Sequence, residues 1–131
     1  MIVYIHGFNS SPASFKAKVL RDGLAARGKP EFLAPALPHS PAAAAHLLAR
    51  LVREHPCAAL VGSSLGGFYA TWLAEQFGLR AVLVNPAVRP YQLLAGHVGR
   101  QKNFHTGEEY EFTLQHVEEL RALEVAAVDA R

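Results

Sequence analysis

The sequence predicts one α/β domain in which helices cover both faces of a parallel sheet, a three-layer α/β/α arrangement. Short apolar runs alternate along the chain with longer segments that carry apolar residues at helical spacing. The short runs are continuously apolar, as expected for parallel strands that are buried on both faces. A chain of 131 residues, half of them hydrophobic, is long enough for one domain with its own core.

Four strands are predicted in the first two thirds of the chain. In sequence order they cover residues 1–5, 32–34, 58–61 and 81–84. Ligand sites in such sheets lie at the carboxyl ends of the strands, where the strand order reverses. We therefore expect all four strands to be parallel, in the order second, first, third, fourth.

Three helices are predicted between these strands, and local signals mark their ends. Ser11-Pro12 and Ser40-Pro41 each combine an N-cap serine with a proline at the first helical position. Gly28 fits the end of the first helix. The third helix is predicted over 65–77 and ends at Gly78.

After the fourth predicted strand, the regular alternation of apolar runs and helical segments ends. A short helix is predicted over 91–98, and the polar and aromatic composition suggests that 88–113 forms a cap over the site. An ordinary surface connection is the alternative for this region. Thr113 is the expected N-cap of a last helix over 114–123, and 125–131 is apolar enough to begin a further strand.

Composition and charge exclude several classes of protein. No apolar run approaches the roughly 20 residues of a membrane span, and the N-terminus does not resemble a signal peptide. The net charge is +2 without a basic stripe, which argues against nucleic-acid binding. The single cysteine, Cys57, cannot form an internal disulfide, and no metal-ligand cluster or cofactor motif is visible. We expect a cytoplasmic protein without metal or cofactor.

One stretch, Gly62-Ser63-Ser64-Leu65-Gly66, has the G-x-S-x-G pattern of a nucleophile elbow. In such an elbow a serine occupies a strained turn between strand and helix. Glycines such as Gly62 and Gly66 support the turn where strand and helix approach most closely. A P-loop would need a lysine in this turn, and a dinucleotide site would need G-x-G-x-x-G. The remaining alternative is a plain turn in which Ser64 is only an N-cap.

The same segments supply part of an acyl-transfer site. Ser64 is the candidate nucleophile. The amides of Leu65, at a helix N-terminus, and Phe8, in the loop after the first strand, are the candidate oxyanion-hole donors. Gly7 lets the backbone approach a ligand closely, and we expect His6 to support this loop rather than act as the base.

Three segments together resemble the YqiA-type bacterial esterases, small proteins of the α/β-hydrolase superfamily. They are His6-Gly7-Phe8-Asn9-Ser10-Ser11-Pro12, Gly62-Ser63-Ser64-Leu65-Gly66-Gly67 and Val84-Asn85-Pro86-Ala87-Val88-Arg89-Pro90. Residues 106–108 and 118–123 are also similar to that family. The resemblance implies an α/β-hydrolase-like fold and hydrolysis of a small acyl ester or thioester, with Ser64 as nucleophile.

The chain departs from the family after the fourth strand. In the family, as in the fold generally, an acid and then a histidine follow the nucleophile. The resemblance therefore implies a truncated domain that lacks the last strand or strands and a helix. Asp129 is the acid candidate because it follows an apolar stub, but no histidine follows it. A base that acts from the cap is the alternative, and the candidates are His97, His105 and His116.

Two functions of different classes remain open. The first is a serine esterase or thioesterase whose activity is impaired, because a serine hydroxyl without a neighbouring base is a weak nucleophile. The second is a non-catalytic, hydrolase-like protein that binds a small acyl ligand or forms a homo-oligomer, because an open strand edge recruits partners. The physiological substrate, the acyl length and the oligomeric state do not follow from the sequence.

Overall fold

The structure, a computed structural model, describes residues 1–28, 31–56, 58–87, 89–103 and 106–124. Its centre is a four-stranded sheet of order β2-β1-β3-β4. The strands are β1 (Ile2–Ile5), β2 (Phe32–Leu33), β3 (Ala59–Ser63) and β4 (Ala81–Val84). All neighbouring strands in this sheet are parallel, so the predicted strand order and direction are confirmed.

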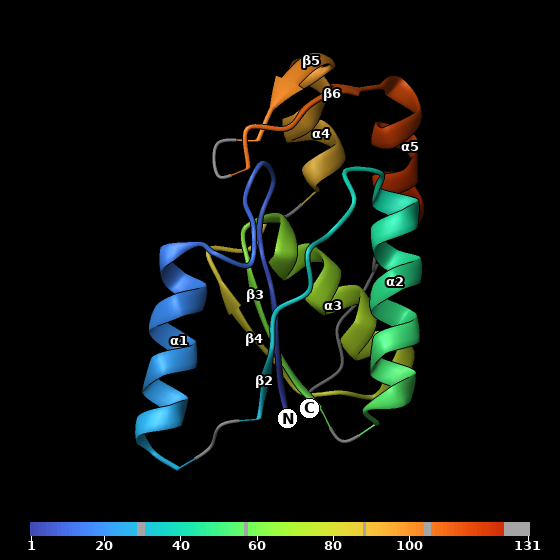
Figure 1. The fold of residues 1–131 in the computed structure, drawn as a ribbon. Coiled ribbons are helices and arrows are strands. Elements are labelled where there is room, and N and C mark those ends of the chain that lie inside the picture. The colour runs from blue at the N-terminus through green and yellow to red at the C-terminus, as the bar shows by residue number, and fades with distance from the viewer. Residues whose placement is uncertain (29–30, 57, 88, 104–105, 125–131) are drawn as a thin grey trace.

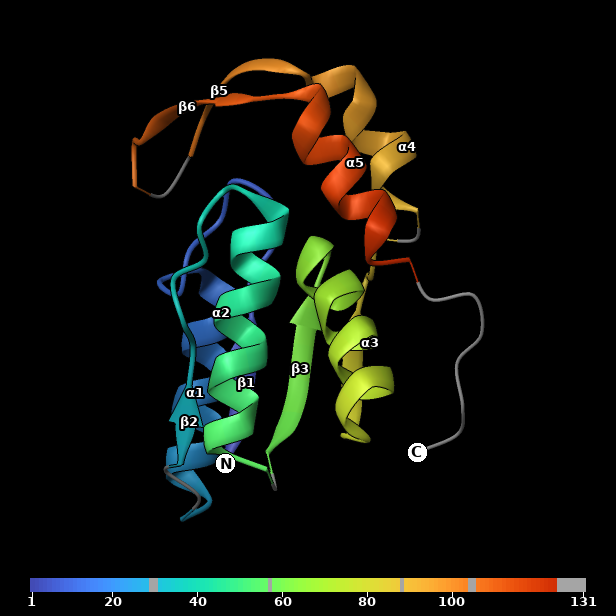
Figure 2. The ribbon, with the colours of Figure 1, turned by 90° about the vertical axis from the view of Figure 1, so that its right-hand side faces the viewer.

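Helices cover both faces of the sheet, as predicted, and give three layers (Figures 1 and 2). α1 (Phe15–Ala26) lies on one face, and α2 (Pro41–Glu54) and α3 (Leu65–Phe77) lie on the other. A further layer covers the end of the sheet at which the strands finish. It consists of α4 (Pro90–Leu94), η1 (Ala95–His97), β5 (Gly99–Lys102), β6 (Glu109–Phe112) and α5 (Leu114–Ala122).

The predicted N-caps are confirmed for α2 and α5 but wrong for α1. The side chains of Ser40 and Thr113 accept hydrogen bonds from amides in the first turns of α2 and α5. The N-cap of α1 is Ser14 instead of Ser11. The Ser11 hydroxyl accepts the amide of Ala13 at 3.1 Å, so it closes a separate turn before the helix begins.

The β5–β6 hairpin was not predicted, because β5 contains no apolar residue and gives no strand pattern. The two strands pair antiparallel from Gly99 opposite Phe112 to Lys102 opposite Glu109. The side chain of Phe112 is 1% exposed and anchors the hairpin in the core. The predicted helix over 91–98 is confirmed in outline, as α4 followed by the short 3-10 helix η1.

The core lies between the sheet and the layer of α2 and α3. The larger core side chains without exposed surface include Val3, Ile5, Leu48, Leu60 and Leu73. By contrast, α1 buries only Ala17, and its Phe15 and Val19 are 79% and 54% exposed. The apolar spacing that predicted α1 therefore marks a face that the described residues leave largely uncovered. No helix in the described part of the chain has the length and apolar character needed to cross a membrane.

Glu119 of α5 joins this helix to the start of α2. Its Oε1 accepts a hydrogen bond from the Ser40 hydroxyl at 2.9 Å and another from the Ala42 amide at 3.0 Å. Partial desolvation acts to raise the pKa of Glu119, but these hydrogen bonds and the nearby His116 outweigh it. The pKa of Glu119 therefore lies below its ordinary value.

Replacing Glu119 with Gln should lower the free energy of unfolding at pH 7. It should also make the free energy of unfolding depend less on pH in the acidic range. Because the folded-state pKa of Glu119 is depressed, its carboxylate stabilises the fold above the unfolded-state pKa. That contribution is lost as the pH falls from the unfolded-state pKa through the lower folded-state pKa. Urea unfolding over this range measures the effect.

Glu118→Gln is the matched control for this experiment. Glu118 lies on the same helix and forms only an exposed ion pair with Arg121, at 3.6 Å. Such pairs contribute little to stability, so this variant should keep the pH profile of the wild type. Identical profiles for Glu119→Gln and the wild type would show that the link between α2 and α5 has no effect on stability.

Candidate active site

Ser64 lies between β3 and α3 in the strained conformation of a nucleophile elbow. Its φ is 55° and its ψ is −120°, a combination that is costly for any residue other than glycine. The Ser64 amide donates to the Val84 carbonyl at 3.1 Å. The Ser64 carbonyl accepts the amides of Gly67 and Ala87 at 3.0 and 2.8 Å. These three hydrogen bonds hold the backbone in the strained turn.

The side chain of Ser64 is exposed and makes no capping hydrogen bond to α3. A serine that served only as an N-cap would accept an amide of the first helical turn. Ser64 therefore stands at the N-cap position of α3, but its side chain does not cap the helix. The turn presents the hydroxyl at the surface, at the carboxyl end of β3.

Gly62 and Gly66 allow β1, β3 and α3 to approach one another closely. A Cβ on Gly62 would lie 2.3 Å from the carbonyl oxygen of Gly66. A Cβ on Gly66 would lie 1.9 Å from the carbonyl oxygen of Ile5. Both distances end on backbone atoms, which cannot turn away as a flexible side chain can. Any side chain at these positions would separate the helix from the sheet.

The loop after β1 lies against the elbow. A Cβ on Gly7 would lie 3.0 Å from the Ser64 Cβ and 3.7 Å from the Ser64 Oγ. Gly7, Phe8 and Ser64 line one open cavity of about 360 Å³, and Leu65 follows directly at the start of α3. The structure thus brings together the two loops that carry the predicted nucleophile and the two predicted oxyanion donors.

His6 is buried beneath this loop and uses both ring nitrogens in it. The Leu37 amide donates to Nε2 at 3.2 Å, so the ring proton lies on Nδ1. Nδ1 is 2.9 Å from the Gly7 carbonyl oxygen, to which it donates. A ring held in this way connects the loops after β1 and β2 and has no ring nitrogen left to accept a proton from Ser64.

The other histidines predicted as possible bases make other contacts in the described structure or lie outside the described residues. The His97 ring packs edge-on against Phe8, with centroids 6.1 Å apart. His116 Nδ1 accepts the Thr113 amide in the capping box of α5. No hydrogen bond between a histidine and the Ser64 side chain is present among the described residues. Two predicted candidates lie outside them: the base candidate His105 and the acid candidate Asp129.

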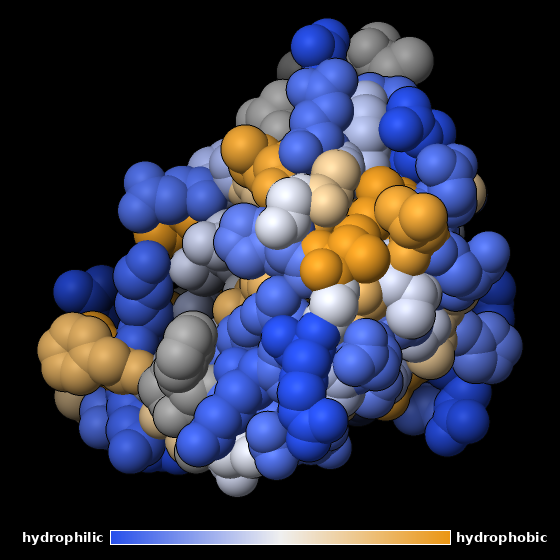
Figure 3. Space-filling view, turned by 90° about the horizontal axis from the view of Figure 1, so that it is seen from above, coloured by the Kyte–Doolittle hydropathy of each residue, from blue (hydrophilic) through white to orange (hydrophobic). Residues whose placement is uncertain are grey.

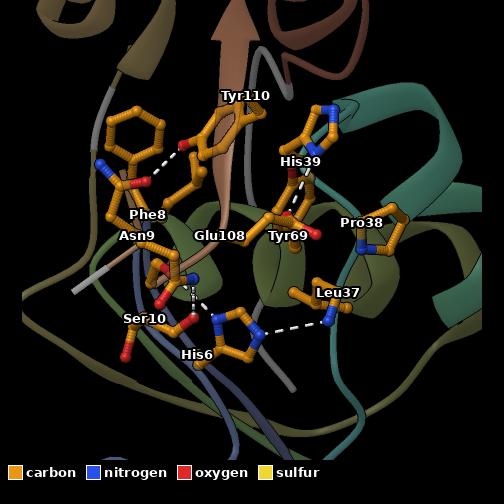
Figure 4. Close-up of a pocket in the computed structure, with 13 residues that line it drawn as sticks. His6, Phe8, Asn9, Ser10, Leu37, Pro38, His39, Tyr69, Glu108 and Tyr110 are labelled. Atoms are coloured by element: carbon orange, nitrogen blue, oxygen red, sulfur yellow. Dashed lines mark hydrogen bonds and ion pairs between the residues drawn. The ribbon is translucent and has the colours of Figure 1, made fainter. Parts of the chain in front are cut away.

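A second cavity lies between the loop after β1, the loop after β2 and the hairpin (Figure 4). Its volume of about 50 Å³ suits a few water molecules rather than a substrate. His39 Nδ1 is 3.7 Å from the Glu108 carboxylate, and the His39 ring stacks on Tyr110 with centroids 4.5 Å apart. Burial raises the pKa of Tyr110 to about 12, so its hydroxyl stays protonated and donates to Asn9. These contacts join the hairpin to the loop after β2 through His39 and to the loop after β1 through Asn9.

Lys16 and His39 were not predicted as site residues. Lys16 Nζ lies 3.4 Å from the hydroxyl of Ser63, the residue before Ser64. The sequence offered one indication that these two residues belong to the site, namely their predicted position in the fold. His39 follows the second strand at the end of the sheet where ligand loops gather, and Lys16 begins the helix after the Phe8 loop.

The surface around this end of the molecule is mostly hydrophilic and is interrupted by apolar patches (Figure 3). Three of the exposed apolar side chains belong to the layer above the sheet: Leu93, Val98 and Leu114.

Within the described residues, no group of three or more His, Cys, Asp and Glu is placed to hold a metal ion. The polar side chains nearest the elbow include the hydroxyls of Ser63 and Ser64 and the ammonium group of Lys16.

Gly66→Ala should lower the free energy of unfolding by about 3 kcal/mol or more, because the new methyl group meets the Ile5 carbonyl. Gly23→Ala is the matched control, since Gly23 lies inside α1 and a Cβ there meets nothing within 4 Å. Removing a glycine from a helix interior should raise stability by about 0.5–1 kcal/mol. Urea unfolding monitored by circular dichroism measures both changes, and equal effects of the two variants would refute the packing argument.

Comparison with solved structures supports the α/β-hydrolase-like fold. One similar structure is described as "LipS and LipT, two metagenome-derived lipolytic enzymes increase the diversity of known lipase and esterase families". It matches with a TM-score of 0.58 at 20% sequence identity, over 93% of this chain. The chain spans 64% of the length of that structure.

The family comparison covers the whole chain. A family model described as "Uncharacterised protein family (UPF0227)" matches residues 1–131. This is the family of the YqiA-type esterases, so the resemblance seen in the motifs is confirmed. The chain belongs to the UPF0227 family.

Proposed function

We propose that the protein is a serine hydrolase that cleaves carboxyl esters or thioesters with Ser64 as the nucleophile. The observation that carries the proposal is the exposed Ser64 hydroxyl on a strained elbow, facing Gly7 across a shared cavity. Membership of the YqiA-type esterase family agrees with this chemistry. So does the description of the structural neighbour, which speaks of lipolytic enzymes.

In the proposed reaction, Ser64 Oγ attacks the carbonyl carbon of the ester and gives its proton to a base. The amides of Leu65 and Phe8 donate to the oxyanion that develops on the carbonyl oxygen. The tetrahedral intermediate then breaks its bond to the leaving group, which departs with a proton as an alcohol or thiol. Water attacks the acyl-serine, releases the acid and restores the Ser64 hydroxyl.

We expect ester hydrolysis by this protein to be slow, because no described histidine is hydrogen-bonded to Ser64. An oxyanion hole and substrate binding without a base supply about 10³–10⁴-fold acceleration over water. Typical enzymes reach at least about 10⁶-fold. A base that acted from the layer above the sheet would raise the rate above this level, and His97 and His116 are the described candidates.

Ser64→Ala should abolish both hydrolysis of p-nitrophenyl butyrate and labelling by a fluorophosphonate probe. Both reactions require the same nucleophilic oxygen. Intact-mass analysis followed by peptide mapping should place the label on Ser64 in the wild type. Ser40→Ala is the control, because Ser40 caps α2 away from the cavity and the variant should still be labelled. Turnover that persists in folded Ser64→Ala would contradict the proposal.

A second candidate function is assembly through β4. Its Val82, Leu83 and Val84 are 62%, 41% and 36% exposed, and β4 pairs only with β3 among the described residues. An exposed apolar edge strand is a surface on which another strand can pair. We propose that a second copy of the chain is the partner at this edge.

Val82→Lys should convert such an assembly to monomers, because a charged residue on an edge strand opposes strand pairing. Sedimentation velocity over a range of protein concentrations measures the change. Leu114→Lys is the control, since Leu114 is similarly exposed at 69% but lies on α5. A wild-type protein that stays monomeric at all concentrations would rule out this second function.

A further inference from the structure

We propose that Lys16 forms an anion-binding subsite beside Ser64, and that the preferred substrate is an ester or thioester whose acyl part carries a carboxylate. This inference relies on the proposed function for the role of Ser64. It adds the chemical class of the substrate, which neither the elbow nor the family match specifies.

The cavity in front of Ser64 has the size of a ligand site, and its partly apolar lining also carries polar groups. Its volume of about 360 Å³ falls within the range of small-molecule pockets. Its described lining includes one ammonium group and several hydroxyl groups but no carboxylate. The charged and hydroxyl-bearing residues that the argument uses are Ser10, Lys16, Ser63 and Ser64. A negatively charged ligand would meet hydrogen-bond donors here, and no negatively charged side chain among the described lining residues would repel it.

The ammonium group of Lys16, an exposed residue, contacts the residue that precedes Ser64. Its Nζ is 3.4 Å from the hydroxyl of Ser63, which is 6% exposed and directly precedes Ser64. Lys16 and Ser64 line the same cavity, so a ligand in it spans the distance between the charge and the serine hydroxyl. A carboxylate that is separated from the carbonyl by a few methylene groups matches this spacing.

Lys16 retains the capacity to bind an anion. An ammonium group has three donors, and the described contact with Ser63 uses one of them. None of the ion pairs between described residues includes Lys16, so its charge has no carboxylate partner among them. A charge that is not neutralised by the protein, at the wall of a cavity, attracts an ion of opposite sign.

A carboxylate fits this subsite better than a phosphate group does. One lysine supplies one positive charge, whereas a phosphate monoester carries about −1.5 to −2 and is usually bound by several donors or by arginine. The ammonium group has no lone pair and only donates hydrogen bonds, so Lys16 does not accept the proton of Ser64 in this arrangement. Lys16 therefore binds and orients the substrate.

Binding can be tested without turnover in the Ser64→Ala protein by ¹H–¹⁵N NMR titration. Monomethyl glutarate and dimethyl glutarate differ only in one free carboxylate. We expect the monoester to bind at least about fivefold more tightly than the diester, and the preference to weaken with added salt. Equal Kd values for the two esters, or no measurable binding of either, would overturn the subsite.

Substitutions in the same background assign the preference to Lys16. Lys16→Gln should abolish the preference for the monoester over the diester, and Lys16→Arg should retain this preference because the positive charge remains. Lys18→Gln is the matched control, since Lys18 is an exposed lysine of the same helix and does not line the cavity. A preference that survives Lys16→Gln, or that Lys18→Gln removes equally, would refute the assignment. Lys16-dependent binding that is tighter for methyl phosphate than for monomethyl glutarate would refute the choice of a carboxylate.

Kinetics separate this inference from the proposed function. With active protein, kcat/KM for mono-p-nitrophenyl glutarate should exceed that for p-nitrophenyl butyrate, and Lys16→Gln should reduce the ratio at least about fivefold, mainly through KM. Hydrolysis that depends on Ser64 but shows no dependence on Lys16 would refute the subsite alone. Lys16-dependent binding without Ser64-dependent hydrolysis would support the subsite and refute the proposed function.

Discussion

The close packing of α3 on the backbone of β1 is the constraint on which the candidate site depends. At Gly66 the helix meets the Ile5 carbonyl with no room for a Cβ. To enter a helix so close to the sheet, the chain must turn sharply after β3, and Ser64 adopts a positive φ in this turn. The same contact brings the end of β1 beside the elbow, so Gly7 faces Ser64. Strain, exposure of the hydroxyl and position of the loop therefore have one structural cause.

The sequence predicted those parts of the fold that local patterns determine. Apolar runs with helices between them require crossovers, and the position of the elbow loop then places β3 beside β1. The start of α1 was wrong because Ser-Pro is as compatible with a turn as with an N-cap, and Ser11 closes a turn. β5 was missed because its residues are all polar or glycine, and the buried anchor of the hairpin, Phe112, lies on its partner strand.

The same distinction applies to the site. The elbow and the Gly7-Phe8 loop were found because each is a short motif with its own backbone requirement. Lys16 was missed because it is 47 positions from Ser63 in the chain, and only the packing of α1 against the elbow brings the two side chains together. His39 and Glu108 come from a loop and a hairpin for which no sequence pattern predicts a contact.

The hydrogen bonds between the hairpin and the loop after β1 have a mechanical consequence. Tyr110 donates to Asn9, and the Asn103 side chain donates to the Ser10 carbonyl at 2.8 Å, so two residues directly after Phe8 are tied to the hairpin. A swing of the hairpin away from the sheet would pull on the backbone that sets the direction of the Phe8 amide. The orientation of the Phe8 amide, which we propose as an oxyanion donor, would then change together with the position of the hairpin.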